Sequence, residues 1–464
     1  MAKNFVSHLN NREISMKNEK KLSYAIYFLL ILAIYLLKAE VSCTNEKHTD
    51  SITVTIAAKQ QEQKIGMMII VLDEGVKTQD LQAVAQILEK DLSFTGQIEV
   101  STVQKKLTTY KQFLTHCMQK DCSLAVVIKY GHKQGSIVWW LYDTSSSQLV
   151  AHNTYDISGK VVRRWAHAIA DQLWPKIIGQ EGFFSTKISY CKEGILKRNR
   201  HKARIKHICV ADYDGSHERV LIKTPTVNVA PRWNNDLRYP LLFYSESTNE
   251  NMRLMVANMK GKRKVASSFD GLNMLPAFSR DGKKVVYCAS RGTGNCQIYY
   301  YQKGQFKRIT HNSGNNVSPS FSGDGNKLYF CSDFQTGYPQ IYTYDLITKK
   351  QTCITSGGYC AAPAYCHKTD QLIYSKMVNG VMQLMLYDNN TKQHIQLTFD
   401  PGNKQEASWS PCGNHVIFNL SKGHSNRIAF FSLHTKKYRF ITSQRAACSY
   451  PHWSPTYISF PITS

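Results

Sequence analysis

The residues of this sequence that could carry out chemistry are carboxylates, histidines and cysteines, and their spacing limits what they can do. Asp281 and Asp324 are each followed directly by glycine, whereas sialidase-type boxes place glycine two residues after the aspartate. Asp-Gly is typical of a tight turn because glycine readily adopts positive φ, so both carboxylates are predicted to form turns. The sequence contains no Gly-x-Ser-x-Gly elbow, Walker loop, His-Glu-x-x-His or dinucleotide fingerprint. It therefore predicts a protein without catalytic residues or a cofactor.

The 16 histidines are scattered along the chain. His116, His167, His207 and His452 fall in predicted helices or strands, with neither a paired carboxylate nor a metal-ligand spacing nearby in sequence. We therefore expect no metal site and no histidine base.

The 13 cysteines invite a disulfide interpretation, because an N-terminal export signal is predicted below. Cys191, Cys288 and Cys331 occupy one repeated strand position, where a small buried side chain is expected. Two nearby pairs stay open as disulfide candidates, Cys117 with Cys122 and Cys360 with Cys366. No Cys-x-x-Cys occurs, which argues against structural zinc.

A short phrase recurs six times in the second half of the chain, typically Pro-x-aromatic-Ser-x-Asp-Gly. Its copies begin at Pro231, Pro276, Pro319, Pro363, Ala407 and Pro451, at steps of 45, 43, 44, 44 and 44 residues. This period is typical of a β-propeller, in which each repeat forms one four-stranded blade. The sequence predicts an all-β six-bladed propeller, with the aromatic residues between blades and Asp-Gly in the turn to the second strand.

The ends of the repeat array predict how the ring closes. Only eleven residues follow Trp453, which is too few for three more strands, while strand patterns at 186–191, 205–212 and 219–224 precede the first phrase. The last blade is therefore expected to combine one C-terminal strand with three strands from before the first repeat, which hides the open edges.

The region before the repeats mixes strand and helix periods. Strands are expected at 51–57, 65–72, 123–130, 136–142 and 148–155, and helices from Thr78 to Leu88 and from about Val161 to Ile178. Thr78 is the predicted N-cap of the first helix. We expect an α/β N-terminal domain over residues 44–180 and the propeller over 181–464.

Charge is the most unusual part of the composition, with 58 Lys+Arg against 33 Asp+Glu and a net charge of +25. Such a balance favours anionic surfaces. The one dense cluster, residues 197–204, is predicted to be a loop between two strands of the closing blade. It is either a solvated loop or a docking patch for an anionic partner.

The N-terminus resembles an export signal. Lys17, Lys20 and Lys21 precede an uncharged run at 22–37, a little short for a spanning helix. Residues 1–43 are assigned to this signal region, with Met16 as an alternative start. Cleavage by signal peptidase, an uncleaved anchor and lipidation of Cys43 all stay open.

The chain resembles the TolB family, the periplasmic component of the Tol-Pal system. The resemblance rests on the six phrases, on the junction at 176–190, on Val210-Ala-Asp-Tyr-Asp-Gly215 and on the terminal Pro451-His-Trp-Ser-Pro455. It implies a non-catalytic, monomeric periplasmic scaffold, peripheral to the envelope membranes and without nucleic acid. It would link a TolA-like inner-membrane protein to the outer-membrane lipoprotein Pal and support envelope integrity and constriction at division.

The resemblance also implies binding residues. A Pal-like partner would meet the connections just before each phrase, at Leu272, Asn273, Leu275, Asn315, Asn316, Val317, Ser318, Tyr359, Glu406 and Tyr450. A TolA-like partner would bind the segment at 44–54, including Thr44, Asp50, Ile52 and Val54. Two alternatives stay open: these residues only line the tunnel wall, or the chain is an exported propeller enzyme or ligand binder with a site in the central tunnel.

Overall fold

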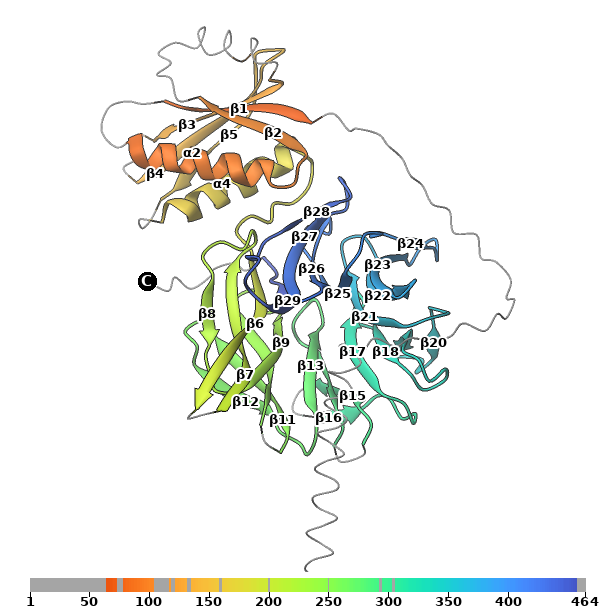
Figure 1. Ribbon diagram of the computed structural model, residues 1–464. Coiled ribbons are helices and arrows are strands. Elements are labelled where there is room, and N and C mark those ends of the chain that lie inside the picture. The colour runs from red at the N-terminus through yellow and green to blue at the C-terminus, as the bar shows by residue number, and fades with distance from the viewer. Residues whose placement is uncertain are drawn as a thin grey trace, which may run out of the picture. The chain divides into compact units, whose positions relative to one another are not determined.

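The computed structural model describes residues 64–72, 78–103, 117, 122–131, 135–157, 161–198, 201–248, 250–291, 294–302 and 305–456. All of them belong to one compact unit, Lys59–Ser464. The protein is mostly β, and two α-helices occur within these ranges (Figure 1). The predicted strand at 51–57 and the predicted export signal lie outside the described residues. None of the described helices is long and apolar enough to cross a membrane.

The first part of the described chain is a five-stranded sheet with two helices. Its elements are β1 (Ile65–Val71), α2 (Thr78–Ser93), β2 (Ile98–Val103), β3 (Leu124–Tyr130), β4 (Ser136–Asp143), β5 (Gln148–Asp156) and α4 (Val162–Ile177). The strand order is β2-β1-β3-β4-β5, with β1 parallel to β2 and β3 and the later pairs antiparallel. Strand β2 was not predicted, because Ile98 to Val103 carries only three apolar residues among polar ones.

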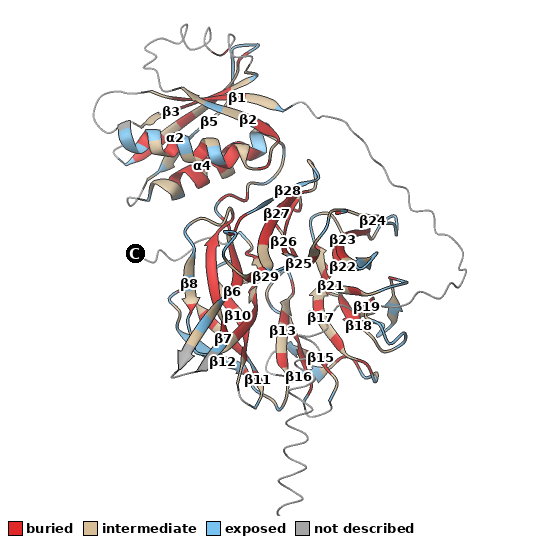
Figure 2. Cartoon of the chain, in the orientation of Figure 1, coloured by how far each residue is buried: buried red, intermediate tan, exposed pale blue. Residues whose placement is uncertain are grey.

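Both helices bury one face, and Figure 2 shows each of them coloured as buried on one side and exposed on the other. On α2 the buried residues include Leu81, Val84 and Leu88, at the spacing that places side chains on one helical face. On α4 they include Trp165, Ile169 and Leu173, as the sequence predicted. These two faces meet in one apolar cluster.

The rest of the chain is built from strands joined by short connections. They are β6 (Lys187–Arg198), β7 (His201–Asp212), β8 (Arg219–Ile222), β9 (Val227–Trp233), β10 (Leu241–Ser247), β11 (Met252–Asn258), β12 (Arg263–Ser267), β13 (Asn273–Phe278), β14 (Val285–Ala289), β15 (Gln297–Gln302), β16 (Gln305–Arg308), β17 (Asn316–Phe321), β18 (Lys327–Ser332), β19 (Gln340–Asp345), β20 (Gln351–Cys353), β21 (Cys360–Cys366), β22 (Gln371–Val378), β23 (Val381–Asp388), β24 (His394–Gln396), β25 (Asn403–Trp409), β26 (His415–Lys422), β27 (Ser425–Ser432), β28 (Lys437–Phe440) and β29 (Cys448–Trp453).

These strands form four separate four-stranded antiparallel sheets and one eight-stranded sheet. The eight-stranded sheet holds β12-β11-β10-β9 and β7-β6-β29 with β8, and only one parallel register pair, Lys206 with Val227, joins the two groups. Strand β29 pairs with β6. Strands β9, β13, β17, β21, β25 and β29 each contact the next, and β29 contacts β9 again; we call these the inner strands.

A repeated hydrogen bond explains why Thr follows the outermost strand of each sheet. Thr310, Thr355, Thr398 and Thr442 each accept, through Oγ1, the backbone N–H of Ile298, Ile341, Leu384 and Ile428, at 2.8–3.0 Å. The hydroxyl supplies the acceptor for a buried N–H where the ladder ends. The Ser-x-Asp-Gly turns work in a similar way. Ser279 donates to Asp281 at 2.5 Å and accepts the N–H of Lys284 at 2.9 Å, so the predicted turn role of Asp281 is confirmed.

The tryptophans of two phrases connect neighbouring inner strands, as expected. The Trp409 indole on β25 donates to the Ala364 carbonyl on β21 at 2.8 Å. The Trp233 indole on β9 donates to the His452 carbonyl on β29 at 3.2 Å. Each contact joins one sheet to the next through a side chain that also fills apolar space.

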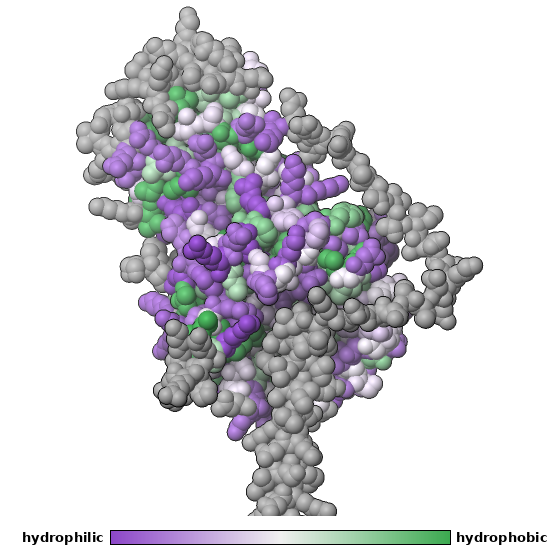
Figure 3. Space-filling model, viewed as in Figure 1, coloured by the Kyte–Doolittle hydropathy of each residue, from purple (hydrophilic) through white to green (hydrophobic). Residues whose placement is uncertain are grey.

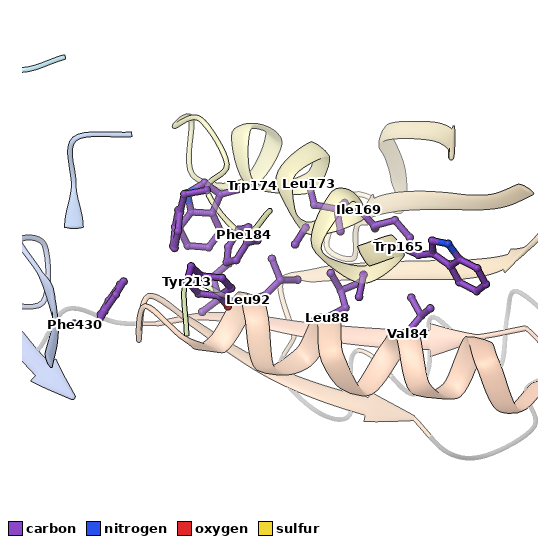
Figure 4. Close-up of a cluster of buried hydrophobic side chains, with 14 of the residues drawn as sticks. Val84, Leu88, Leu92, Trp165, Ile169, Leu173, Trp174, Phe184, Tyr213 and Phe430 are labelled. Atoms are coloured by element: carbon purple, nitrogen blue, oxygen red, sulfur yellow. The ribbon is translucent and has the colours of Figure 1, made fainter. Parts of the chain in front are cut away.

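One apolar cluster joins the helices to the strand region (Figure 4). Leu92 of α2 and Trp174 of α4 belong to it together with Tyr213, which follows β7, and Phe430 of β27. The Phe94 ring lies 5.0 Å from that of Tyr213 and 4.6 Å from that of Phe430. Elsewhere polar residues dominate the face seen in Figure 3, with apolar residues in small patches.

Beside this cluster lies a buried set of charges, which we call the charged clasp: Asp91, Arg163, His167 and Asp212. His167 Nδ1 on α4 lies 2.7 Å from Asp91 Oδ2 on α2, and its Nε2 lies 3.7 Å from Asp212 Oδ2 at the end of β7. Arg163 Nε donates to Asp212 at 2.7 Å. The expectation that His167 has no paired carboxylate was therefore wrong, because its partners are 76 and 45 residues away in sequence.

None of the cysteines in the described ranges forms a disulfide. Cys191, Cys288 and Cys331 are buried in strands, as predicted. The candidate pair Cys360 and Cys366 occupies the two ends of β21, about 20 Å apart at 3.3 Å per residue, which is too far for a disulfide. Burial raises the pKa of Cys117 to about 11, with a further contribution from Cys122, and no disulfide joins these two residues.

Candidate partner-binding surface

Each inner strand bends at the residue just before its repeated phrase. Ala230, Leu275, Ser318, Ala362, Glu406 and Tyr450 all have φ between 51° and 57°. The register with the second strand shifts across these positions in every case. This is a β-bulge: the following residue is usually proline, which has no N–H for the ladder, and the extra residue adopts a left-handed conformation.

This geometry corrects the expectation that the ten Pal-facing residues lie in connections. Seven of them belong to inner strands, because pairing begins three residues before the proline. They are Asn273, Leu275, Asn316, Val317, Ser318, Glu406 and Tyr450. Only Leu272, Asn315 and Tyr359 lie just before a strand, and all three are half-buried.

Asn273 and Asn316 are fully buried and form structural hydrogen bonds, so a direct contact with a partner is not supported for either. The Asn273 amide donates to the Phe269 carbonyl at 2.6 Å and to the Met252 carbonyl at 3.0 Å. The Asn316 amide donates to Asn312 Oδ1 at 2.7 Å. The bonds to Phe269 and to Asn312 each reach a residue four positions earlier and hold the turn that enters the strand.

Lys404 occupies the same repeat position on β25 and is likewise fully buried. Its ammonium group contacts the carbonyl of Asp400, again four residues earlier, and lies 3.1 Å from the Asp400 carboxylate. Asn228 holds this position on β9, so four of the six inner strands have a donor nitrogen there, whereas β21 and β29 have Cys360 and Cys448. The pattern is hard to see in the sequence because the residue type changes from strand to strand.

The remaining predicted residues differ in how strongly hydrogen bonds and packing restrain their side chains. Asn315 is fixed, since its N–H and its amide donate to Asp333 at 2.7 and 3.2 Å and its Oδ1 accepts from Cys296. Val317 packs against a buried cluster that includes Tyr329 and Cys360. Leu275 and Ser318 are half-buried at the left-handed position.

Glu406 and Tyr450 form part of a polar group on three inner strands. Glu406 Oε2 accepts the Tyr450 N–H at 2.8 Å. Burial raises the pKa of Glu406 to about 7, while the charge of Arg232 on β9 acts in the opposite direction. The Lys206 ammonium lies 5.6 Å from the centre of the Tyr450 ring and donates to Ser449 Oγ at 3.2 Å. The group combines carboxyl, guanidinium, ammonium and phenol.

The described residues bear on the metal and catalytic sites considered above. They contain no group of three or more His, Cys, Asp or Glu that could hold a metal ion. Asp281 and Asp324 are engaged in turns. The four residues expected to meet a TolA-like protein, Thr44, Asp50, Ile52 and Val54, lie outside the described residues, and their role stays a prediction.

Comparisons with known proteins give a consistent result. The family model described as the TolB beta propeller domain matches residues 174–457. The Tol-Pal system protein TolB of Francisella tularensis subsp. tularensis (strain FSC 198) is 28% identical over 256 residues, which cover 53% of this chain and 57% of the relative. Its counterpart in Rickettsia prowazekii (strain Madrid E) is 28% identical over 214 residues, 44% of this chain and 46% of the relative. The chain thus spans about half the length of these curated relatives.

Among solved structures, TolB from Acinetobacter baumannii superposes with a TM-score of 0.72 at 23% identity, covering 85% of this chain and 97% of that chain. At this identity the likeness concerns the fold. It extends over the five-stranded sheet as well as the propeller strands.

Proposed function

Because this chain belongs to the TolB beta propeller domain family, we propose that it is a non-catalytic scaffold of a Tol-Pal system. In this proposal the chain is exported to the periplasm and binds a Pal-like lipoprotein through the end of the propeller where the inner strands begin. A TolA-like inner-membrane protein binds the segment at 44–54. The assembly supports envelope integrity and constriction of the outer membrane at division.

The proposed architecture has six blades and an α/β N-terminal domain. Counting the eight-stranded sheet as two blades, beside the four four-stranded sheets, supports this number. The closed cycle of contacts among the inner strands also supports it. The two helices on a mixed five-stranded sheet support a separate N-terminal domain.

The observation that carries the binding proposal is the left-handed position of the inner strands. The backbone there is the same in all six strands, yet the residues are Ala, Leu, Ser, Ala, Glu and Tyr. The next position is proline in five of the six strands, whereas no residue type occurs in more than two strands at the left-handed position itself. Left-handed φ costs about 1–2 kcal/mol for a residue with a Cβ, and such strain is often kept at functional sites.

The test is binding of the full chain to the soluble domain of a Pal-like lipoprotein, measured by calorimetry. Leu275→Asp and Ser318→Asp are each expected to weaken binding at least roughly tenfold, since they place a charge in a desolvated contact. Val317→Asp is less suitable, because Val317 packs against the core.

The matched control is Ile395→Asp on the outer strand β24, where Ile395 is 48% exposed. It introduces the same charge far from the inner strands, and the affinity should stay unchanged. Full affinity in both Leu275→Asp and Ser318→Asp would refute the proposed surface.

A further inference from the structure

The hairpin of β6 and β7 is the longest in the propeller region. Its register runs from Lys187 opposite Asp212 to Arg198 opposite His201, with twelve paired positions. The other hairpins between second and third strands have five to eight. The predicted loop at 197–204 is therefore wrong, since strand pairing continues to residues 198 and 201.

The outer part of this hairpin has no third strand beside it among the described residues. Strand β29 last pairs with β6 at Lys192, and the Glu193 N–H donates to the Ala447 carbonyl at 2.9 Å. Strand β7 pairs with β9 at Lys206 and with β8 only at 208–210. We call residues 194–198 and 201–205 the basic ribbon. A two-stranded ribbon is only marginally stable in water, so its length calls for an explanation.

The sequence of the basic ribbon makes it less stable still. No Asp or Glu occurs from 194 to 211, and the last acid, Glu193, lies 3.8 Å from Lys206. The register sets Lys197 opposite Lys202, and like charges directly opposite one another are destabilising. Such a pairing is relieved when an anionic surface lies against it.

An exposed apolar residue lies close to these charges in the register. Ile195 is opposite Arg204, two positions along each strand from Lys197 and Lys202. Ile195 is 66% exposed, and Arg204 is exposed as well. An exposed apolar residue flanked by cations is typical of proteins that bind at the membrane–water interface.

We propose that the basic ribbon docks on an anionic lipid bilayer, with its cations against the headgroup phosphates and Ile195 entering the interface. Juxtamembrane cations contribute roughly fivefold in affinity each. The ribbon leaves the sheet beside Ala447, the position before β29 that corresponds to Leu272 and Asn315. It therefore lies at the same end as the proposed lipoprotein surface, although lipid docking does not require that partner.

The test uses the full chain and sedimentation with vesicles of phosphatidylglycerol and phosphatidylethanolamine, compared with phosphatidylcholine vesicles. The predicted export signal can itself insert into lipid, so the quantity compared is the binding that salt removes. Lys197→Glu/Lys202→Glu should weaken this component at least roughly tenfold. Ile195→Ser should weaken it a few-fold and leave its salt dependence unchanged.

The control is Lys349→Glu/Lys350→Glu, an equal change of charge at the exposed turn before β20. The affinity of this control for the anionic vesicles should stay within roughly twofold of the parent. A loss equal to that of the Lys197→Glu/Lys202→Glu variant would mean that only net charge matters, and would overturn the proposal. Unchanged salt-sensitive binding of Lys197→Glu/Lys202→Glu to the anionic vesicles would also overturn the proposal. This holds even if that variant loses affinity for an acidic protein. If the ribbon variant melts at a lower temperature, Lys197→Gln/Lys202→Gln replaces it. A failure of lipid docking leaves the Leu275 test of the lipoprotein surface unaffected.

Discussion

His167 and His415 are both buried, but their surroundings favour opposite protonation states. Burial alone would lower the pKa of His167, yet hydrogen bonding to Asp212 and Asp91 outweighs it and raises the pKa to about 9. His415 lies between Phe183 and Phe430, at ring distances of 4.6 and 5.0 Å, and burial lowers its pKa to about 3. Neither ring nitrogen of His415 has a hydrogen-bond partner. The native protein therefore holds one charged and one neutral histidine at neutral pH.

These two pKa shifts predict opposite effects of pH on stability. In the unfolded chain both histidines titrate near 6.5. The contribution of His167 is fully present below pH 6.5 and is lost as pH rises toward 9. The contribution of His415 is present above pH 6.5 and is lost as pH falls toward 3. The upper limits are about 3 kcal/mol for His167 and about 5 kcal/mol for His415.

Urea unfolding at a series of pH values checks this prediction. His167→Gln should flatten the loss of stability between pH 6.5 and 9, and His415→Leu should flatten the loss below pH 6.5. Each variant is the control for the other. An alkaline slope that is the same in His167→Gln and in the parent would contradict the role given to the charged clasp.

Single residues also show what sequence can reveal at this scale. The prolines, aromatic residues and Asp-Gly turns were predictable, because each has a local preference that the repeat makes visible. The left-handed residue before each proline was not, since Leu275 or Tyr450 has no such preference and the bulge arises from pairing with the next strand. The partners of His167 were not predictable either, because they come from another helix and from the propeller.

At the scale of elements, the turn after β7 is fitted closely against the sheet of β25, β26, β27 and β28. Gly215 has φ +86°, and a Cβ placed there would lie 1.9 Å from the Ile441 carbonyl oxygen that follows β28. Gly179, after α4, has a similar φ of +78°, but a Cβ there would meet nothing within 4 Å. The two glycines have the same backbone requirement and different surroundings.

We therefore expect Gly215→Ala to destabilise the protein much more than Gly179→Ala. The strain of a left-handed alanine costs about 1 kcal/mol at either site. At Gly215 the clash also forces the turn, with Asp212 and Tyr213, away from the helices, for a total of about 3 kcal/mol or more. Chemical denaturation measures the difference, and equal losses in the two variants would contradict it.

Most elements were predictable from their periods, and the exceptions have physical causes. The helices and strands β1, β3, β4 and β5 carry clear helical or alternating patterns, and they were found within a few residues of their predicted bounds. Strand β2 lacks such a pattern because only its first residue is fully buried. The basic ribbon carries so many charges that it looked like a loop, although its backbone pairs as strands.

At the scale of the whole molecule, the propeller region depends on one short strand. Among the described strands, β29 is the only pairing partner of β6 on the side away from β7, and Trp453 donates to Thr186 Oγ1 at 2.8 Å. The closure was predictable because the repeat array ends with an incomplete unit. The position of the charged clasp was not, since nothing in the repeat specifies what packs on its end.

A chain ending at Ala446 should therefore lose cooperative unfolding. Without β29 the edge of β6 is open and the aromatic contacts of Trp453 are lost. Circular dichroism in the near ultraviolet during thermal unfolding measures the effect. Adding a peptide of residues 444–464 should restore a cooperative transition, and a truncated chain with the parental midpoint would contradict the prediction.

The late arrival of β29 has a consequence for biogenesis. Trp453 and Thr186 are 267 residues apart in sequence, so the ring stays open until β29 has left the ribosome. Until then the propeller region cannot finish folding, which would suit the export proposed above. The same delay exposes unpaired strand edges for the whole period of synthesis. The propeller region therefore becomes fully compact only after β29 has been synthesised.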